Sequence, residues 1–206
     1  MKIQIHDMGG QPTELTKFPQ FIQQWVAQDR DGYRNYVLFV ASMSDFNVPD
    51  DEKTDTKLED QREGQDEHTK LERSIRILEL LLCEATVQSC GLLIFFNKQD
   101  RFDEVVTTLQ RTENGRREIE KALGDVMSQS DRARLISGNC PLEVLHDALM
   151  KKYDVVIKKR RGKSSDRGVY MRFTQAVDPD IMSDIFKVVK HEIISDFIRN
   201  GTFITL

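Results

Sequence analysis

Two short runs of consecutive apolar residues constrain the fold of this chain more than any other feature. The run "NYVLFVASM" covers residues 35–43, and "LLIFF" covers residues 92–96. Each has the length of a β-strand and is apolar at nearly every position, which is typical of strands buried on both faces of a sheet. The segment between them carries aliphatic residues at helical spacing: Leu71, Ile75, Leu78 and Leu82. Strands joined through helices pair in parallel, so we predict an α/β fold.

The rest of the chain continues this alternation of strands and helices. Phe18, Ile22 and Trp25 share one face of a predicted helix, and a later apolar stripe starts at Ile181. We predict a strand at 2–6, a helix at 13–29, a solvated charged loop at 48–68, mainly helix at 102–160 with a break at 137–139, a basic loop at 158–168, a strand at 169–177 and a helix from 178.

Charge and composition exclude several classes of function. The net charge of −4 argues against general affinity for nucleic acid or for an anionic membrane. No apolar run has the length of a transmembrane segment. The three cysteines show no C-x-x-C spacing, and the four histidines are scattered, so a metal site built by histidines is not expected. We therefore expect a cytoplasmic, soluble protein that does not bind nucleic acid.

Three of the predicted strands end in segments with polar residues. These segments are residues 7–11, 97–100 and 174–177. In parallel α/β sheets, ligands bind beyond the carboxyl ends of the strands, where such segments meet. The topology therefore predicts one ligand site built from all three.

The segment "NKQD", Asn97 to Asp100, suits the recognition of guanine. The carboxylate of Asp100 can accept the ring N–H and the exocyclic amine of guanine, a pair of donors that adenine does not offer. Asn97 can brace the neighbouring loops, and the stem of Lys98 can cover the face of the base. We predict a guanine-reading role for this strand end.

The segment "DMGGQ", residues 7–11, suits a terminal phosphate. Its glycines allow backbone N–H groups to approach a phosphate oxygen, and Asp7 can hold Mg²⁺ through water. Gln11 can orient an attacking water. The alternative reading is a tight turn between a strand and a helix, where Gly-Gly is common.

With these motifs in place, the chain resembles the later half of the alpha subunits of heterotrimeric G proteins. The resemblance rests on "DMGGQ", "VLFVASMSDFN", the acidic loop into "LERSIRILELLL", "LLIFFNKQDRF" and "RFTQAVD". It is weakest at about residues 105–168. It implies a partial P-loop GTPase-type (Ras-like) domain over residues 1–206, with a mostly parallel sheet flanked by helices and without the first strands.

The resemblance also implies a set of site residues. Gln11 would be catalytic, Asp7 would hold Mg²⁺ through water, and the backbone N–H of Ala176 would meet the base oxygen. The ligands would be GTP or GDP with Mg²⁺. The implied nucleotide-binding residues are Asp7, Met8, Gly9, Gly10, Gln11, Asn97, Lys98, Gln99, Asp100 and Ala176.

The implied role is a signal transducer that couples G-protein-coupled receptors to effectors. The helix at residues 13–29 would be the nucleotide-dependent switch that contacts effectors and the beta-gamma dimer. The helix at 178–206 would engage an activated receptor. Such partners would bring a cytoplasmic protein to the inner face of the plasma membrane.

The chain also departs from the family pattern. The family's phosphate loop, helical domain, first switch and catalytic arginine precede the D-x-G-G-Q turn, so we expect none of them in this sequence. The one G-K-S, residues 162–164, has Ile157 where a Walker motif requires glycine. Pro12 and Leu15 replace basic residues of the switch, and the family's cysteine near the end has no counterpart.

Two hypotheses on function therefore stay open. In the first, the sequence is part of a GTP-hydrolysing transducer, whose activity depends on the phosphate loop and Mg²⁺. In the second, it is a non-catalytic module that binds a receptor or a beta-gamma dimer and does not bind GTP productively. On either hypothesis we expect residues 1–30 to be weakly anchored, because their usual neighbouring strand is missing.

Overall fold

The sheet of this protein contains three parallel strands among the residues that the structure describes. The structure is a computed structural model, and it describes residues 6–7, 14, 17–27, 35–50, 69–161, 168–175, 183, 187, 190–191 and 194–195. The strands are β1 (Tyr36–Ser42), β2 (Gly91–Asn97) and β3 (Val169–Phe173), in the order β1-β2-β3. Both pairs are parallel, which confirms the α/β prediction and the parallel sheet.

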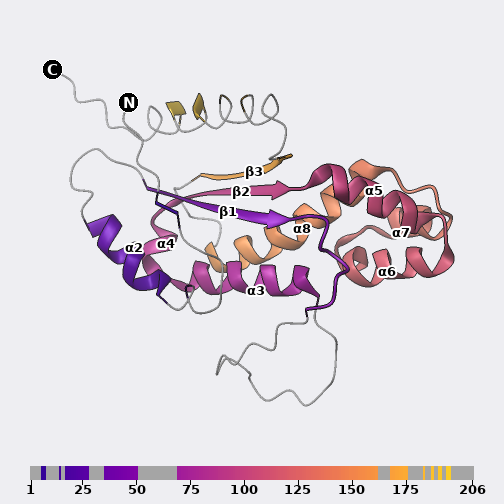
Figure 1. Cartoon of the computed structure of the whole chain (residues 1–206), viewed down its shortest axis with the longest axis horizontal. Helices are drawn as coiled ribbons and strands as arrows, with labels where there is room; N and C mark the ends of the chain where they lie inside the picture. The colour runs from indigo at the N-terminus through magenta and orange to yellow at the C-terminus, as the bar shows by residue number, and fades with distance from the viewer. Residues whose placement is uncertain are drawn as a thin grey trace, which may run out of the picture.

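Helices flank this sheet on one face and at both ends (Figure 1). α3 and α8 pack against each other below the sheet, while α5, α6 and α7 lie beyond the carboxyl ends of the strands. The helices are α2 (Phe18–Ala27), α3 (Lys70–Cys83), α4 (Ala85–Gln88), α5 (Gln99–Gln110), α6 (Glu113–Leu123), the 3-10 turn η1 (Gly124–Val126), α7 (Gln129–Ile136) and α8 (Leu142–Arg161).

The ends of these helices follow from local chemistry. Thr69 and Glu72 form a capping box that starts α3: the Thr69 hydroxyl accepts from the Glu72 N–H, and the Glu72 carboxylate accepts from the Thr69 N–H. Gly138 ends α7 at a φ of 77°, and its N–H donates to the Leu135 carbonyl. The predicted break at 137–139 is thus confirmed.

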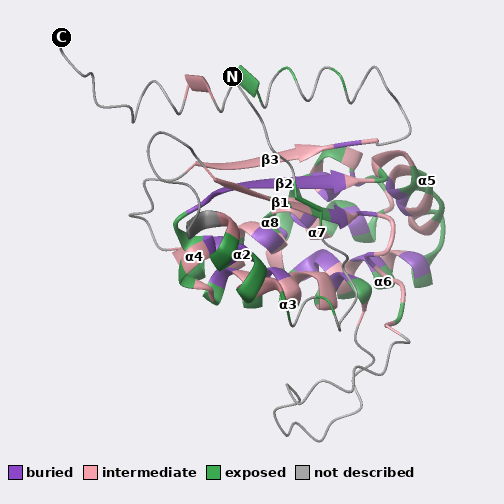
Figure 2. Cartoon of the chain, turned by 60° about the vertical axis from the view of Figure 1, so that its left-hand side comes forward, coloured by how far each residue is buried: buried purple, intermediate pink, exposed green. Residues whose placement is uncertain are grey.

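The hydrophobic core lies between β2 and the α3–α8 layer. Every residue of β2 from Gly91 to Phe96 is buried, which confirms the prediction for this strand (Figure 2). The Phe96 ring packs on Tyr153 of α8 with their centroids 5.1 Å apart. Leu71, Leu78 and Leu82 of α3 are buried as the stripe predicts.

The prediction that β1 is buried on both faces is wrong. The side chains of Leu38 and Val40 are 48% and 56% exposed. The register places them beside Leu93 and Phe95, on the sheet face opposite α3 and α8. Among the described strands β1 pairs on one side only, and an all-apolar run does not distinguish such an edge strand from a central one.

The basic segment 158–168 is also less of a loop than predicted, because α8 continues to Arg161. Arg160 and Lys159 of its last turn pair with Glu79 of α3 at 2.7 and 3.2 Å. The hydrogen bond from Arg160, with help from Lys159, holds the pKa of Glu79 below its ordinary value. These ion pairs fasten the end of α8 to α3.

Several predicted elements fall outside the described residues. These are most of the strand at 2–6, the start of the helix at 13–29, residues 51–68 of the charged loop and most of the segment from 178. The six described positions of that last segment are helical, and Ser183, Lys187, Lys190 and His191 are exposed. No described helix is long and apolar enough to cross a membrane.

We predict that Leu78→Ala lowers the free energy of unfolding by about 2–5 kcal/mol, because Leu78 is fully buried and the truncation leaves a cavity. Leu80→Ala is the matched control, since the same change on the same helix removes a side chain that is 43% exposed. It should shift the free energy by about 0.5 kcal/mol or less. Urea denaturation measures both, and equal losses would contradict the assigned orientation of α3.

We also predict a loss of stability above pH 10 that depends on Tyr153. Burial raises its pKa to about 12, and its hydroxyl donates to Ser74 Oγ at 3.0 Å. Above about pH 10 the unfolded chain releases this proton while the folded chain keeps it, so the contribution of Tyr153 is present below pH 10 and disappears towards pH 12.

From pH 10 to pH 12 the free energy of unfolding of the native protein should therefore fall by roughly 2–3 kcal/mol more than that of the Tyr153→Phe variant. Denaturation at the two ends of this range measures the difference. Parallel losses in both proteins would show that Tyr153 is not responsible.

Candidate functional site

The carboxyl ends of β2 and β3 are fastened to each other by hydrogen bonds. The Thr174 N–H donates to the Phe96 carbonyl at 2.7 Å, and the Gln99 N–H donates to the Thr174 carbonyl at 3.3 Å. The Thr174 hydroxyl donates to Asn97 Oδ1 at 3.4 Å. The structure therefore brings the segments 97–100 and 174–175 together, and Asn97 braces them as its residue type predicts.

The end of β1 joins the same site. The Met43 N–H donates to the Asn97 carbonyl at 2.9 Å, which holds the turn after β1 beside the end of β2. Ser44 and Asp45 follow, and the Ser44 hydroxyl donates to the Asp45 carboxylate at 3.0 Å. The edge thus carries polar groups from three neighbouring strands, all at their carboxyl ends.

Lys98 makes the connection from β2 to α5 in a single residue. Its φ of 63° lies in the left-handed region, and among the described residues no other non-glycine has a positive φ. This conformation turns the chain sharply, so that Asp100 falls in the first turn of α5. The Lys98 ammonium lies 3.9 Å from the Asp45 carboxylate, and its side chain is half exposed.

Asp100 and Asp103 lie on the same side of the start of α5 but have different surroundings. Asp103 Oδ1 lies 2.5 Å from His146 Nε2 of α8. The half-buried Asp100 carboxylate has no hydrogen-bond or ion-pair partner within the described part of the chain. A carboxylate in the first helical turn interacts favourably with the helix dipole. The acceptor oxygens of Asp100 are therefore open to donors from a ligand.

The structure does not bring Asp7 to this strand end. Asp7 is exposed, and the neighbouring His6 ring stacks on Trp25 of α2 at 4.4 Å. α2 packs on α4, which leads into the amino end of β2, so this group lies at the opposite end of the sheet (Figure 1). The stacking and the packing of α2 keep Asp7 away from Asn97. Met8, Gly9, Gly10, Gln11 and Ala176 lie outside the described residues.

The described residues do not make a magnesium site on their own. They contain no group of three or more His, Cys, Asp or Glu side chains that could hold a metal ion. Mg²⁺ is usually held by one or two carboxylates together with phosphates and water. Asp7, the predicted ligand, is exposed, so a metal there would depend on phosphates and water for most of its ligands.

Three side chains of the strand-end region were missed from the sequence. Asp45 pairs with Lys98, and His146 pairs with Asp103 across 43 positions of the chain. The four histidines looked scattered, and no spacing signal links His146 to Asp103. Only the packing of α8 on α5 brings them together.

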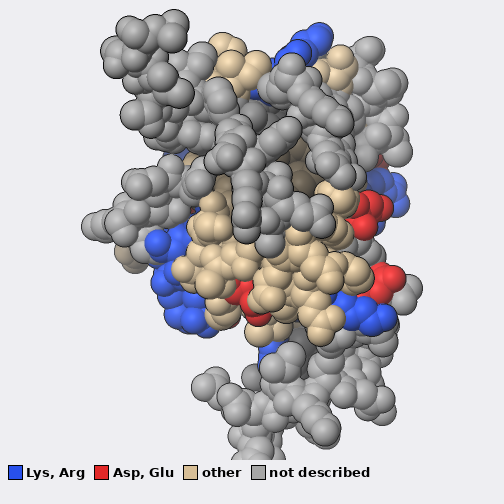
Figure 3. Space-filling view, turned by 90° about the vertical axis from the view of Figure 1, so that its left-hand side faces the viewer, with Lys and Arg blue, Asp and Glu red and all other residues tan. Residues whose placement is uncertain are grey.

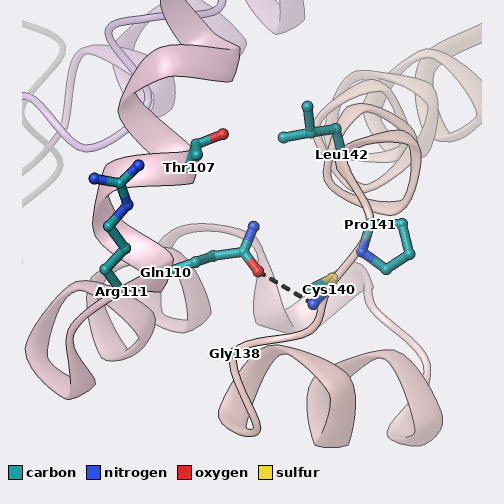
Figure 4. A pocket seen from close by; sticks show the side chains of 7 residues that line it. All are labelled: Thr107, Gln110, Arg111, Gly138, Cys140, Pro141 and Leu142. Atoms are coloured by element: carbon teal, nitrogen blue, oxygen red, sulfur yellow. Dashed lines mark hydrogen bonds between the residues drawn. The ribbon is translucent and has the colours of Figure 1, made fainter.

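A cavity of about 420 Å³ lies at the far end of α5 (Figure 4). Gln110 at the end of α5 accepts the Cys140 N–H at 3.1 Å. Burial, and next the charge of Asp131, raise the pKa of the Cys140 thiol, which does not favour a reactive thiolate. Ten residues of helix, roughly 15 Å, separate this cavity from Asp100. It is lined by Thr107, Gln110, Arg111, Gly138, Cys140, Pro141 and Leu142.

No model of a protein family matches this chain, and no curated protein matches it.

We predict that Lys98→Gly raises the free energy of unfolding by about 0.5–1 kcal/mol. Glycine removes a left-handed strain of roughly 1–2 kcal/mol and costs about 0.5–1 kcal/mol in chain entropy. Lys98→Ala is the control, because it keeps the Cβ and therefore the strain. Thermal or urea unfolding compares the two. A glycine variant less stable than the alanine variant would refute the strain at this turn.

Proposed function

We propose that this protein binds guanine nucleotides, with Asn97, Lys98 and Asp100 reading the base. The observation that carries this proposal is the open Asp100 carboxylate at a braced strand end. The domain would be a partial Ras-like GTPase domain, and the protein a signal transducer of the G-protein alpha-subunit type. The three-stranded parallel sheet with flanking helices is compatible with such a partial domain.

The preference for guanine follows from the chemistry of one carboxylate. Guanine presents its N1–H and its exocyclic amine side by side, and the two oxygens of Asp100 can accept both. Adenine presents an unprotonated N1 at the corresponding place, so the same carboxylate would meet an acceptor. A partly buried polar group left without its partner costs free energy, which gives the discrimination.

The phosphate end of the nucleotide rests on the resemblance alone. GTP hydrolysis, Mg²⁺ and the role of Gln11 would require the phosphate loop and the arginine that the family carries before its D-x-G-G-Q turn. The proposed partners also come from the resemblance: a beta-gamma dimer, a G-protein-coupled receptor at the last helix and an effector at the helix that includes α2. The proposal supported by the described residues is recognition of the base.

The position of α2 favours the second hypothesis, a non-catalytic binding module. α2 and Asp7 lie at the end of the sheet opposite the guanine-reading residues. Figure 3 looks onto that end of the molecule, and the described residues at the centre of this view are mainly uncharged. Phe21 of α2 is 38% exposed. An uncharged surface with an exposed aromatic side chain is typical of contacts with another protein.

We predict that Asp100→Asn changes the preferred base from guanine to xanthine. Asparagine keeps one acceptor for the N1–H and replaces the other with an amine donor, which suits the 2-oxo group of xanthine. Binding of GDP should fall by about tenfold or more, and binding of XDP should rise. Calorimetry with GDP, XDP and ADP measures the three affinities.

Asp147→Asn is the matched control, because it makes the same change at an exposed position of α8. It should leave all three affinities unchanged. A native protein that binds GDP and ADP equally would refute guanine recognition. A native protein that binds neither would favour the non-catalytic module.

A further inference from the structure

The geometry points to His146 as a positioning residue for guanine recognition, which holds the start of α5 so that Asp100 faces the base. This inference rests on the proposed function. His146 belongs to α8 and is buried, 43 residues from Asp103 in the sequence, and it lies next to the elements that carry the candidate site.

His146 contacts two elements of the site at once. Its ring centroid lies 5.5 Å from that of Phe102, in the first turns of α5. The same centroid lies 5.1 Å from the ring centroid of Phe173, the last residue of β3. Thr174 follows β3 directly; its carbonyl accepts the Gln99 N–H, and its hydroxyl donates to Asn97 Oδ1. His146 thus fills the space behind the turn that presents the guanine-reading groups.

The hydrogen bond of His146 fixes the rotation of α5. Its Nε2 lies 2.5 Å from Asp103 Oδ1, and Asp103 shares a helix face with Asp100 because they are three residues apart. A side-chain end lies roughly 5–6 Å from the helix axis, so a rotation of about 20° displaces it by roughly 2 Å. A bidentate hydrogen bond to a base does not survive such a displacement.

Packing holds this end of α5 through the buried Phe102, whose ring lies 5.3 Å from that of Phe46, but few polar groups among the described residues orient it. Lys98 at the N-cap position makes no side-chain capping hydrogen bond to the helix. The nearby Arg101–Glu104 pair is exposed and joins two residues of the same helix, so it does not orient α5 relative to the sheet. The Gln99–Thr174 hydrogen bond holds the first residue, and the His146–Asp103 bond holds the next turn.

The test separates the hydrogen bond of His146 from its packing. His146→Phe keeps a ring between Phe102 and Phe173 but cannot bond Asp103. His146→Gln places an amide nitrogen where Nε2 lies and keeps a donor for Asp103. Glu104→Gln is the control, since it neutralises an exposed carboxylate on the same helix without touching His146. Each variant is compared with the native chain in GDP and ADP affinity, unfolding free energy and amide hydrogen exchange of residues 99–103.

We expect His146→Phe to lower the ratio of GDP to ADP affinity by about tenfold and to speed exchange in the first turn of α5. His146→Gln and Glu104→Gln should keep the native ratio. A ratio that stays native in His146→Phe, or that falls equally in His146→Gln, would overturn the positioning role and leave guanine binding intact. A native chain without a guanine preference would overturn both proposals, and it is recognised before any variant is made.

Discussion

The parallel pairing of β2 with β1 and β3 is the constraint on which the candidate site depends. β2 is buried from Gly91 to Phe96, so its register with both neighbours is fixed by the core on one side and by Leu93 and Phe95 on the other. Because all three strands run in the same direction, their last residues meet at one edge. The hydrogen bonds of Asn97 and Thr174 are formed at this edge.

The same geometry separates the proposed base-reading residues from Asp7. Asn97, Lys98 and Asp100 lie at the carboxyl edge of the sheet, on a tight turn with Lys98 in the left-handed region. Asp7 and α2 sit at the amino end, through the stacking of His6 on Trp25 and the packing of α2 on α4. The base and the phosphates of one bound nucleotide would have to be contacted by residues that lie close together. The proposal therefore rests on the strand-end residues and not on Asp7 or α2.

Features set by local chemistry were predictable from the sequence, whereas features set by distant packing were not. The burial of β2, the stripe of α3 and the break at Gly138 follow from apolar pattern and turn chemistry, and all three are confirmed. The exposure of Leu38 depends on how many strands and helices surround β1, which its own residues do not encode.

The same limit applies to the site. Asn97 and Asp100 lie three residues apart in one short motif, so the sequence alone brings them together. The rule that strand ends converge also predicts Asp7 beside them, whereas the structure has Asp7 next to the His6–Trp25 stack on α2, which packs on α4. His146 contacts Asp103 only because α8 packs on α5, and no short sequence pattern predicts that packing.

An NMR titration of the isotope-labelled chain with guanosine and with adenosine tests guanine recognition most directly. Guanosine should shift the backbone amide signals of Lys98, Gln99 and Asp100, and adenosine at the same concentration should leave them in place. Guanine recognition at this strand end would be refuted if guanosine left these signals unchanged, or if it shifted those of Gln110 and Cys140 at the distant cavity instead.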